Sequence, residues 1–168
     1  MRYQHCPKCG GNLSLEETQD VNRPKCTSCG FVFFQNPAVG VAAILIRDRK
    51  VLLGRRIGSY SGTWCIPCGY VEYTEDVRDA LVREMKEETG LDFELGDIFA
   101  VHSNFHNPAQ HTVGLWFLAQ AEGDPIPLDD LDQVDFFSYE ELESSNMVLA
   151  FPTDGLVLKS LKDKDFID

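Results

Sequence analysis

Three glutamates near the middle of the chain could together bind a divalent cation. The segment from Thr74 to Gly90 is predicted to be a helix, with the threonine as N-cap and the glycine as C-cap. At about 100° per residue, Glu84, Glu87 and Glu88 continue the apolar stripe of its first half. Neighbouring carboxylates repel one another in a bare helix, and their oxygens suit Mg²⁺ or Mn²⁺. On this pattern alone, the alternative is a solvated acidic helix end.

The residues around this helix follow a wider spacing. Gly69 is followed after five residues by Glu75, and after seven more by the run Arg83-Glu-Met-Lys-Glu-Glu-Thr-Gly-Leu91. This spacing resembles the signature of the Nudix hydrolases at nine positions over 23 residues. The resemblance implies an α+β fold, a Nudix α/β/α sandwich with a mixed sheet. It also implies hydrolysis, dependent on Mg²⁺ or Mn²⁺, of a nucleoside diphosphate linked to another moiety.

The resemblance assigns roles to six residues of the signature. These are the metal ligands Glu84, Glu87 and Glu88, the orienting salt-bridged pair Arg83 and Glu75, and Gly69, whose turn lets the backbone approach the metal.

The sequence does not identify the general base. In the family a glutamate often precedes a late strand and serves as base or additional ligand, but this chain has Gln133 there. Asp132, or one of Asp129 and Asp130, could substitute. One of the signature glutamates could also double as the base.

A second chemical pattern, a set of four cysteines, lies in residues 1–35. Two Cys-x-x-Cys-Gly knuckles, Cys6/Cys9 and Cys26/Cys29, are separated by 16 residues. This spacing predicts a four-thiolate Zn²⁺ site of the ribbon type, with each glycine permitting a tight turn that points N–H groups at sulfur. Zinc would supply most of the folding free energy of so short a segment. Two disulfides or a redox pair are the alternatives.

Two further patterns have competing interpretations. A third Cys-x-x-Cys, Cys65 and Cys68, is interpreted as two small buried residues, with a redox switch or second metal site as the alternative. The polar loop 102–111 holds three of the four histidines. It is interpreted as a loop over a substrate cleft, with a transition-metal site as the alternative.

The remaining segments predict one domain over residues 36–168. Strands are predicted at 39–46, 51–56, 93–101 and 111–121, and near 134–137. The first of these is apolar throughout, as expected of a strand covered on both faces. A short helix is predicted after Ser138 and a terminal helix from a Thr153 cap to Lys162. Residues 31–37 are predicted to be a strand, and 124–135 a loop.

The composition limits the partners. The chain has 168 residues, 43% of them hydrophobic, and a formal charge of −12 that disfavours nonspecific binding to nucleic acid or an anionic membrane. It has neither an apolar run of membrane-span length nor a secretory signal, so the cytoplasm is expected. The expected partner is a small-molecule nucleotide. For the ribbon we expect a structural or homodimer-forming role.

The substrate is narrowed by a second resemblance. A zinc ribbon joined to a Nudix domain resembles the NADH pyrophosphatases, whose Ser-Gln-Pro-Trp-Pro-Phe-Pro stretch is replaced here by Phe99-Ala-Val-His-Ser-Asn-Phe105. The run Gln35-Asn-Pro37 and the Trp-x-x-Pro-x-Gly-Tyr approach to the signature look closer to ribbon-bearing ADP-ribose and FAD pyrophosphatases. ADP-ribose or FAD is therefore expected ahead of NADH.

Substrate contacts are expected from several side chains. Arg55 or Arg56 could hold a phosphate, and a purine could stack on an aromatic ring, the candidates being Phe34, Tyr70, Tyr73, Phe105 and Trp116. An enzyme that removes a nucleotide cap from RNA and a catalytically silent nucleotide sensor remain alternatives, and the three intact glutamates weigh against the sensor.

Overall fold

A computed structural model of the chain describes residues 3–18 and 21–168, and it divides the chain into two compact units, 1–37 and 38–168. In the first unit, β1 (Leu13–Thr18) and β2 (Val21–Cys26) form an antiparallel hairpin. The strand predicted at 31–37 is reduced to a bridge between Val32 and Lys25. Pro24 in β2 accepts a hydrogen bond from the Phe33 N–H but has no N–H to return, so the ladder stops there.

The second unit is built on the mixed sheet that the sequence predicts. Its strand order is β5 (Trp64–Cys65), β4 (Lys50–Arg56), β3 (Ala38–Arg47), β8 (Thr112–Ala121) and β7 (Phe93–Asn104). In addition, β6 (Cys68–Tyr70) pairs with β3, and β9 (Leu131–Phe137) pairs with β4. Among the paired strands of the described chain, only β3 and β8 run parallel.

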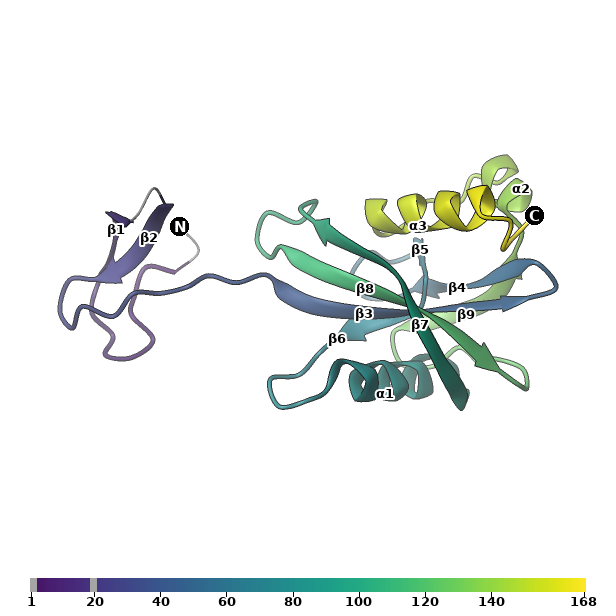
Figure 1. Cartoon of the computed structure of the whole chain (residues 1–168), viewed down its shortest axis with the longest axis horizontal. Helices are drawn as coiled ribbons and strands as arrows, with labels where there is room; N and C mark the ends of the chain where they lie inside the picture. Colours follow the sequence, from purple (N-terminus) through teal and green to yellow (C-terminus); the bar gives the residue numbers. More distant parts are fainter. Residues whose placement is uncertain (1–2, 19–20) are drawn as a thin grey trace. The chain divides into compact units, whose positions relative to one another are not determined.

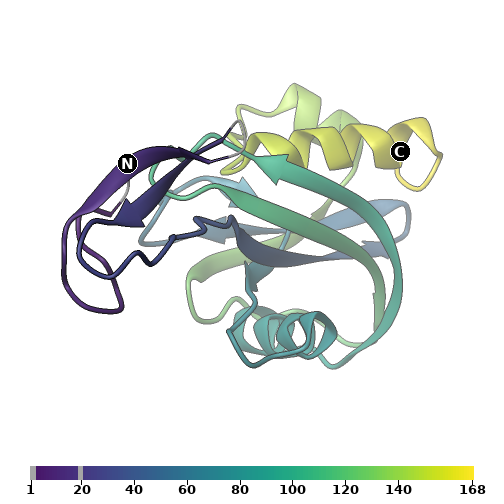
Figure 2. The same cartoon turned by 60° about the vertical axis from the view of Figure 1, so that its left-hand side comes forward.

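Helices cover both faces of this sheet (Figures 1 and 2). One face carries α1 (Val77–Thr89), and the other carries α3 (Pro152–Asp163) beside the short α2 (Tyr139–Ser144). Strand β3 shows why its sequence is apolar throughout. Val41, Ala43 and Leu45 share a core with α1, whereas Ala42 and Ile44 share a core with α3. Within the described residues, no helix is both long and apolar enough to span a membrane.

The start of α1 differs from the prediction. The N-cap is Asp76, which accepts a hydrogen bond from the Arg78 N–H at 2.9 Å, and not Thr74. The preceding turn, closed by a hydrogen bond from the Glu75 N–H to the Glu72 carbonyl, delays the helix. Gly90 ends the helix in the left-handed conformation, with φ of 70°, as predicted.

Of three other predicted boundaries, one agrees with the structure and two differ. Ser138 caps α2 through a capping box, as predicted. Helix α3 begins at Pro152 after Phe151, so Thr153 is not its cap. Its buried hydroxyl instead accepts a hydrogen bond from Asn104. Strand β9 starts at Leu131, inside the predicted loop, because pairing with β4 extends it.

Candidate active site and four-cysteine cluster

A cavity of about 490 Å³ opens between the signature segment and the start of α3. Glu84 and Glu88 from α1 line it, together with Gly69 from β6. Glu87 is exposed on the same helix and contacts Arg83 at 3.1 Å. The helix therefore brings two of the three predicted ligands to the cavity, whereas the third is not among the described residues that line it.

Arg83 ties the acidic residues together. Its Nε and Nη2 donate to the two carboxylate oxygens of Glu75, both at 2.9 Å, as expected for the orienting pair. Its Nη1 donates to Glu84 at 2.7 Å, and Nη2 also donates to the Tyr70 carbonyl at 3.1 Å. The guanidinium lowers the pKa of Glu75 through these hydrogen bonds. The planar fork of an arginine can hold this many acceptors at fixed positions.

Gly69 leaves space that the Glu84 carboxylate fills. A Cβ at this position would lie 1.8 Å from the carboxylate carbon of Glu84 and 2.1 and 2.2 Å from its oxygens. Any side chain would therefore displace this carboxylate. The requirement is one of close approach, which only glycine meets.

Glu88 is a buried carboxyl whose environment suits a cation. Its side chain is only 2% exposed and accepts a hydrogen bond from the Cys68 N–H at 2.8 Å. Burial raises its pKa to about 10, and Cys65 and Asp130 add to the increase. The Oδ1 of Asp130 is buried with no hydrogen-bond partner among the described residues. Facing carboxyl groups of this kind require a proton or a metal ion between them, and the donor set fits Mg²⁺ or Mn²⁺.

The structure distinguishes between the acids near Gln133. Gln133 pairs with Arg55 within the sheet, and Asp132 forms a bidentate ion pair with Arg55 at 2.7 and 3.0 Å. In contrast, Asp129 and Asp130 line the cavity. Of the acids that could replace the family glutamate, these two are the ones placed to act there.

The two neighbouring arginines of β4 have different surroundings, as expected because successive side chains of a strand point to opposite faces. Arg55 lies outside the cavity lining in the described chain, bound to Asp132, so the phosphate contact predicted for it does not fit this position. Arg56 lines the cavity, forms an ion pair with Asp130 and packs over the ring of Phe151 at 5.7 Å. The register shift at this point leaves Asp132 unpaired, so the extra residue of the bulge belongs to β9.

Some of the aromatic residues predicted to stack on a purine line the cavity, and others do not. Tyr70 and Trp116 line the cavity. Phe105 is 67% exposed, packs edge-on against His111 and lies outside the lining in the described chain. The lining residues that the sequence reasoning did not single out include Tyr60, Asn104, His106, Phe151 and Asp154, from three separate segments. No motif marks them, although Asn104 and His106 lie in the loop predicted to cover the cleft.

Asp154 is a buried carboxylate that connects three elements. It is 2% exposed and accepts hydrogen bonds from the Ile66 N–H at 3.1 Å and the Trp116 indole at 3.2 Å. Burial raises its pKa to about 7, against these two hydrogen bonds. Its contacts fix the Trp116 ring on the cavity wall and the backbone that leads to Gly69.

The third cysteine pair and the loop histidines make contacts within the protein. Cys65 is fully buried, and its hydrogen bond with Cys68, followed by burial, raises the pKa of Cys68, which weakens the reactivity of that thiol. The three histidines of loop 102–111 each contact a different aromatic residue, with ring pairs His102–Trp116, His106–Tyr60 and His111–Phe105.

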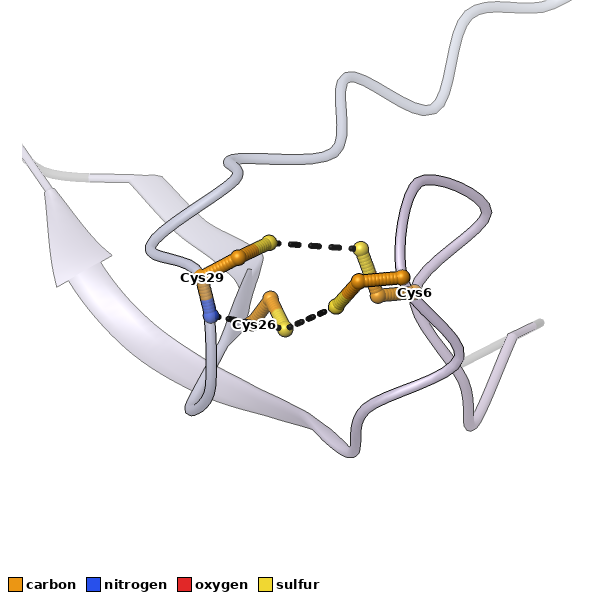
Figure 3. A group of neighbouring side chains, drawn as sticks. Cys6, Cys26 and Cys29 are labelled. Atoms are coloured by element: carbon orange, nitrogen blue, oxygen red, sulfur yellow. Dashed lines mark hydrogen bonds between the residues drawn. The ribbon is translucent and has the colours of Figure 1, made fainter.

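The four cysteines of the first unit gather at one point (Figure 3). Their sulfurs all lie within 4.8 Å of one another, with Cys6–Cys29 at 3.8 Å and Cys9–Cys26 at 3.5 Å. These distances exclude disulfides, and a tetrahedral zinc with bonds of about 2.3 Å would place sulfurs roughly 3.8 Å apart. The N–H groups of Lys8 and Cys29 point at sulfur, each at 3.4 Å.

The second unit thus consists of a mixed sheet between helical layers, with carboxylates of α1 facing a cavity of about 490 Å³. The model of the NUDIX domain family matches residues 36–154. The chain therefore belongs to the NUDIX family, and it is a Nudix hydrolase, as its signature predicted.

Individual relatives agree with this assignment. The chain is 31% identical over 135 residues to an ADP-ribose pyrophosphatase of Methanocaldococcus jannaschii, covering 79% of this chain and 78% of the relative. It is 29% identical over 144 residues to the NAD-capped RNA hydrolase NudC of Haemophilus influenzae, covering 83% of this chain but 53% of the relative. It thus spans about half of that protein.

A solved structure is also similar over nearly the whole chain. A NUDIX hydrolase from Nitrosomonas europaea superposes with a TM-score of 0.81 at 29% identity, covering 96% of this chain and 92% of that one.

Proposed function

We propose that this protein hydrolyses the pyrophosphate bond of ADP-ribose or FAD and releases AMP. Water adds across the P–O–P linkage, so that the second product is ribose 5-phosphate or FMN. The observation that carries the proposal is the group of Glu84, Glu88 and Asp130 carboxyls facing one cavity of about 490 Å³. The similarity to an ADP-ribose pyrophosphatase along most of both chains supports this choice of substrate.

The catalytic metal, Mg²⁺ or Mn²⁺, would be held by Glu84, Glu87 and Glu88 together with the Gly69 segment and Asp130. When bound, it supplies the positive charge that neutralises phosphate oxygens and acidifies a water. Arg83 holds Glu84 and Glu87 in place. Arg56, which lines the cavity and forms an ion pair with Asp130, would contact a phosphate there.

The four-cysteine cluster would hold a Zn²⁺ ion with a structural role. The sulfur separations of 3.5 and 3.8 Å match the tetrahedral geometry, and the small core of this unit consists of Cys6, Leu13 and Cys26 with Phe31 packed against it. So small a core cannot stabilise the unit alone, so zinc would stabilise its fold.

Product analysis tests the enzymatic proposal. The protein is incubated with Mg²⁺ or Mn²⁺ and ADP-ribose, FAD, NADH or nucleoside triphosphates, and AMP formation is followed. Glu84→Gln and Glu88→Gln should each lower kcat at least about 100-fold, because each removes a charged ligand. Asp79→Asn makes the same change of charge on an exposed part of the same helix and should retain activity. Full activity of both glutamine variants would refute the metal assignment.

A second candidate activity is cleavage of NADH or of NAD-capped RNA. The similarity to NudC favours it, although this chain spans about half of that relative. The formal charge of −12 opposes binding of a long RNA. Selective cleavage of NADH or capped RNA, with little AMP from ADP-ribose and FAD, would replace the first proposal. Nucleotide binding without turnover would instead favour a sensor.

A further inference from the structure

Three aromatic rings meet on the cavity wall beside Arg56. Tyr60 comes from the loop after β4, His106 from the loop after β7, and Phe151 from the residue before α3. The ring centroids of Tyr60 and Phe151 are 5.4 Å apart, those of Tyr60 and His106 5.6 Å, and those of His106 and Phe151 5.7 Å. All three residues line the cavity. We refer to them as the aromatic wall.

The polar atoms of the aromatic wall are satisfied within the protein. The backbone N–H of His106 donates to Asn104 Oδ1 at 3.3 Å, which fixes the orientation of this amide. His106 Nδ1 must then carry its proton to donate to the same oxygen, so Nε2 accepts the Tyr60 hydroxyl proton at 2.8 Å. Asn104 Nδ2 in turn donates to Thr153 Oγ1 at 3.2 Å, and both residues are buried.

This hydrogen-bond chain decides what kind of group the wall can recognise. The tips of Tyr60 and His106 are already paired with each other, so the wall offers ring surface to a ligand in preference to donors and acceptors. Ring surface suits a planar aromatic group and does not read the hydroxyls of a sugar.

The backbone of Tyr60 adopts a conformation that is unfavourable for a residue with a bulky side chain. Tyr60 has φ of 61°, in the left-handed region that bulky residues rarely adopt. Its carbonyl accepts hydrogen bonds from both the N–H, at 3.1 Å, and the hydroxyl of Thr63. A strained conformation held in this way is typical of a residue that a site requires.

We propose that Tyr60, His106 and Phe151 form the subsite for the adenine ring of the substrate. This inference rests on the proposed function and specifies how its substrate is recognised. Adenine is the ring that ADP-ribose and FAD share, and in ADP-ribose it is the only planar ring. Arg56, 5.7 Å from the Phe151 ring and paired with Asp130, lies between the wall and the metal-facing carboxyls, where the phosphates of the same nucleotide would lie.

Binding of two product-like probes, measured by calorimetry on the full chain, tests the subsite without requiring turnover. AMP carries the base and ribose 5-phosphate lacks it. Tyr60→Ala should weaken AMP binding roughly 5- to 150-fold, the usual range for losing one base–aromatic stack. The same variant should change ribose 5-phosphate binding less than about twofold. Phe151→Leu should have the same selective effect, and Tyr60→Phe should retain most of the AMP affinity.

Two aromatic residues outside the lining serve as matched controls. Phe105→Ala changes a ring in the same loop as His106, and Tyr73→Ala changes a fully exposed ring. Both should bind AMP as the wild type does. A thermal unfolding midpoint within a few degrees of the wild type shows that each variant is folded.

The outcomes separate the subsite from the catalytic proposal. Unchanged AMP binding in both Tyr60→Ala and Phe151→Leu, equal losses for the two probes, or a selective loss only in Tyr70→Ala would overturn the subsite. AMP binding that depends on Tyr60, in a protein that cleaves neither ADP-ribose nor FAD, would support the subsite and refute the proposed function. Turnover of ADP-ribose with no dependence on the three rings would support the proposed function and refute the subsite.

Discussion

Replacing Gly69 by alanine should inactivate the enzyme while leaving its fold intact. The added Cβ would lie 1.8 Å from the Glu84 carboxylate carbon, whereas non-bonded carbon atoms stay at least about 3.5 Å apart. The carboxylate must therefore move by more than about 1.5 Å. It would leave the position that Arg83 fixes through a hydrogen bond of 2.7 Å.

This displacement has a large effect on catalysis and a small one on stability. A misplacement of about 1 Å in a catalytic group can cost about 100-fold in rate, so kcat should fall by at least that factor. The clash involves the far end of a flexible side chain, and the Arg83–Glu84 ion pair is partly exposed. The free energy of unfolding should therefore change by no more than about 1 kcal/mol.

The assay compares kcat and the Mg²⁺ concentration for half-maximal activity in Gly69→Ala and Gly155→Ala. A Cβ at Gly155, within α3, would meet its nearest neighbour at 3.6 Å, so this control should be active and about 0.5–1 kcal/mol more stable. Wild-type kcat and metal dependence in Gly69→Ala would refute the placement of Glu84 as a metal ligand. Global unfolding of this variant would refute the stability argument.

Three other predictions concern separate parts of the molecule. Arg83→Lys loses the bidentate contact with Glu75 and should lower kcat about 10- to 100-fold. Arg78→Lys, on the same helix, should leave kcat unchanged. Equal kcat values in the two variants would contradict the orienting role of Arg83. Metal analysis should find about one zinc per chain, and a zinc-free protein would rule out the tetrahedral site. Burial raises the pKa of Asp154 to about 7 in the folded protein, so ionisation of this carboxyl opposes folding. The free energy of unfolding of the wild type, relative to that of Asp154→Asn, should therefore fall as pH rises from about 4 to 7. The fall should be at most roughly 4 kcal/mol. Denaturant titrations at pH 4.5 and 7.5 measure this difference, and a constant value would show that the carboxyl is not titrating in that range.

Helical periodicity made much of the carboxylate cluster at the cavity predictable. Glu84 and Glu88 are four residues apart, so any helix over this segment places them on one face. The Arg83–Glu75 pair and Gly69 were identified through the signature spacing. The four cysteines were also identified from their spacing. Each Cys-x-x-Cys pair lies in a short local turn, and the β1–β2 hairpin brings the two pairs together.

Tertiary structure decided the parts of the site that come from distant segments. Asp130 reaches the cavity that Glu88 lines because β9 pairs with β4, and Arg56 forms an ion pair with its carboxylate. Strand alternation predicts that Arg55 and Arg56 point to opposite faces, but which of the two faces the cavity depends on how distant segments pack.

The aromatic wall shows the same limit most clearly. Tyr60, His106 and Phe151 lie in three loops, each irregular in sequence and without a motif. Loops have no periodicity from which the direction of a side chain can be inferred, and their ends are brought together only when the sheet forms. The sequence by itself therefore determined which acidic and thiol side chains gather on the signature helix and in the cysteine cluster. Long-range strand pairing decided which side chains surround the cavity.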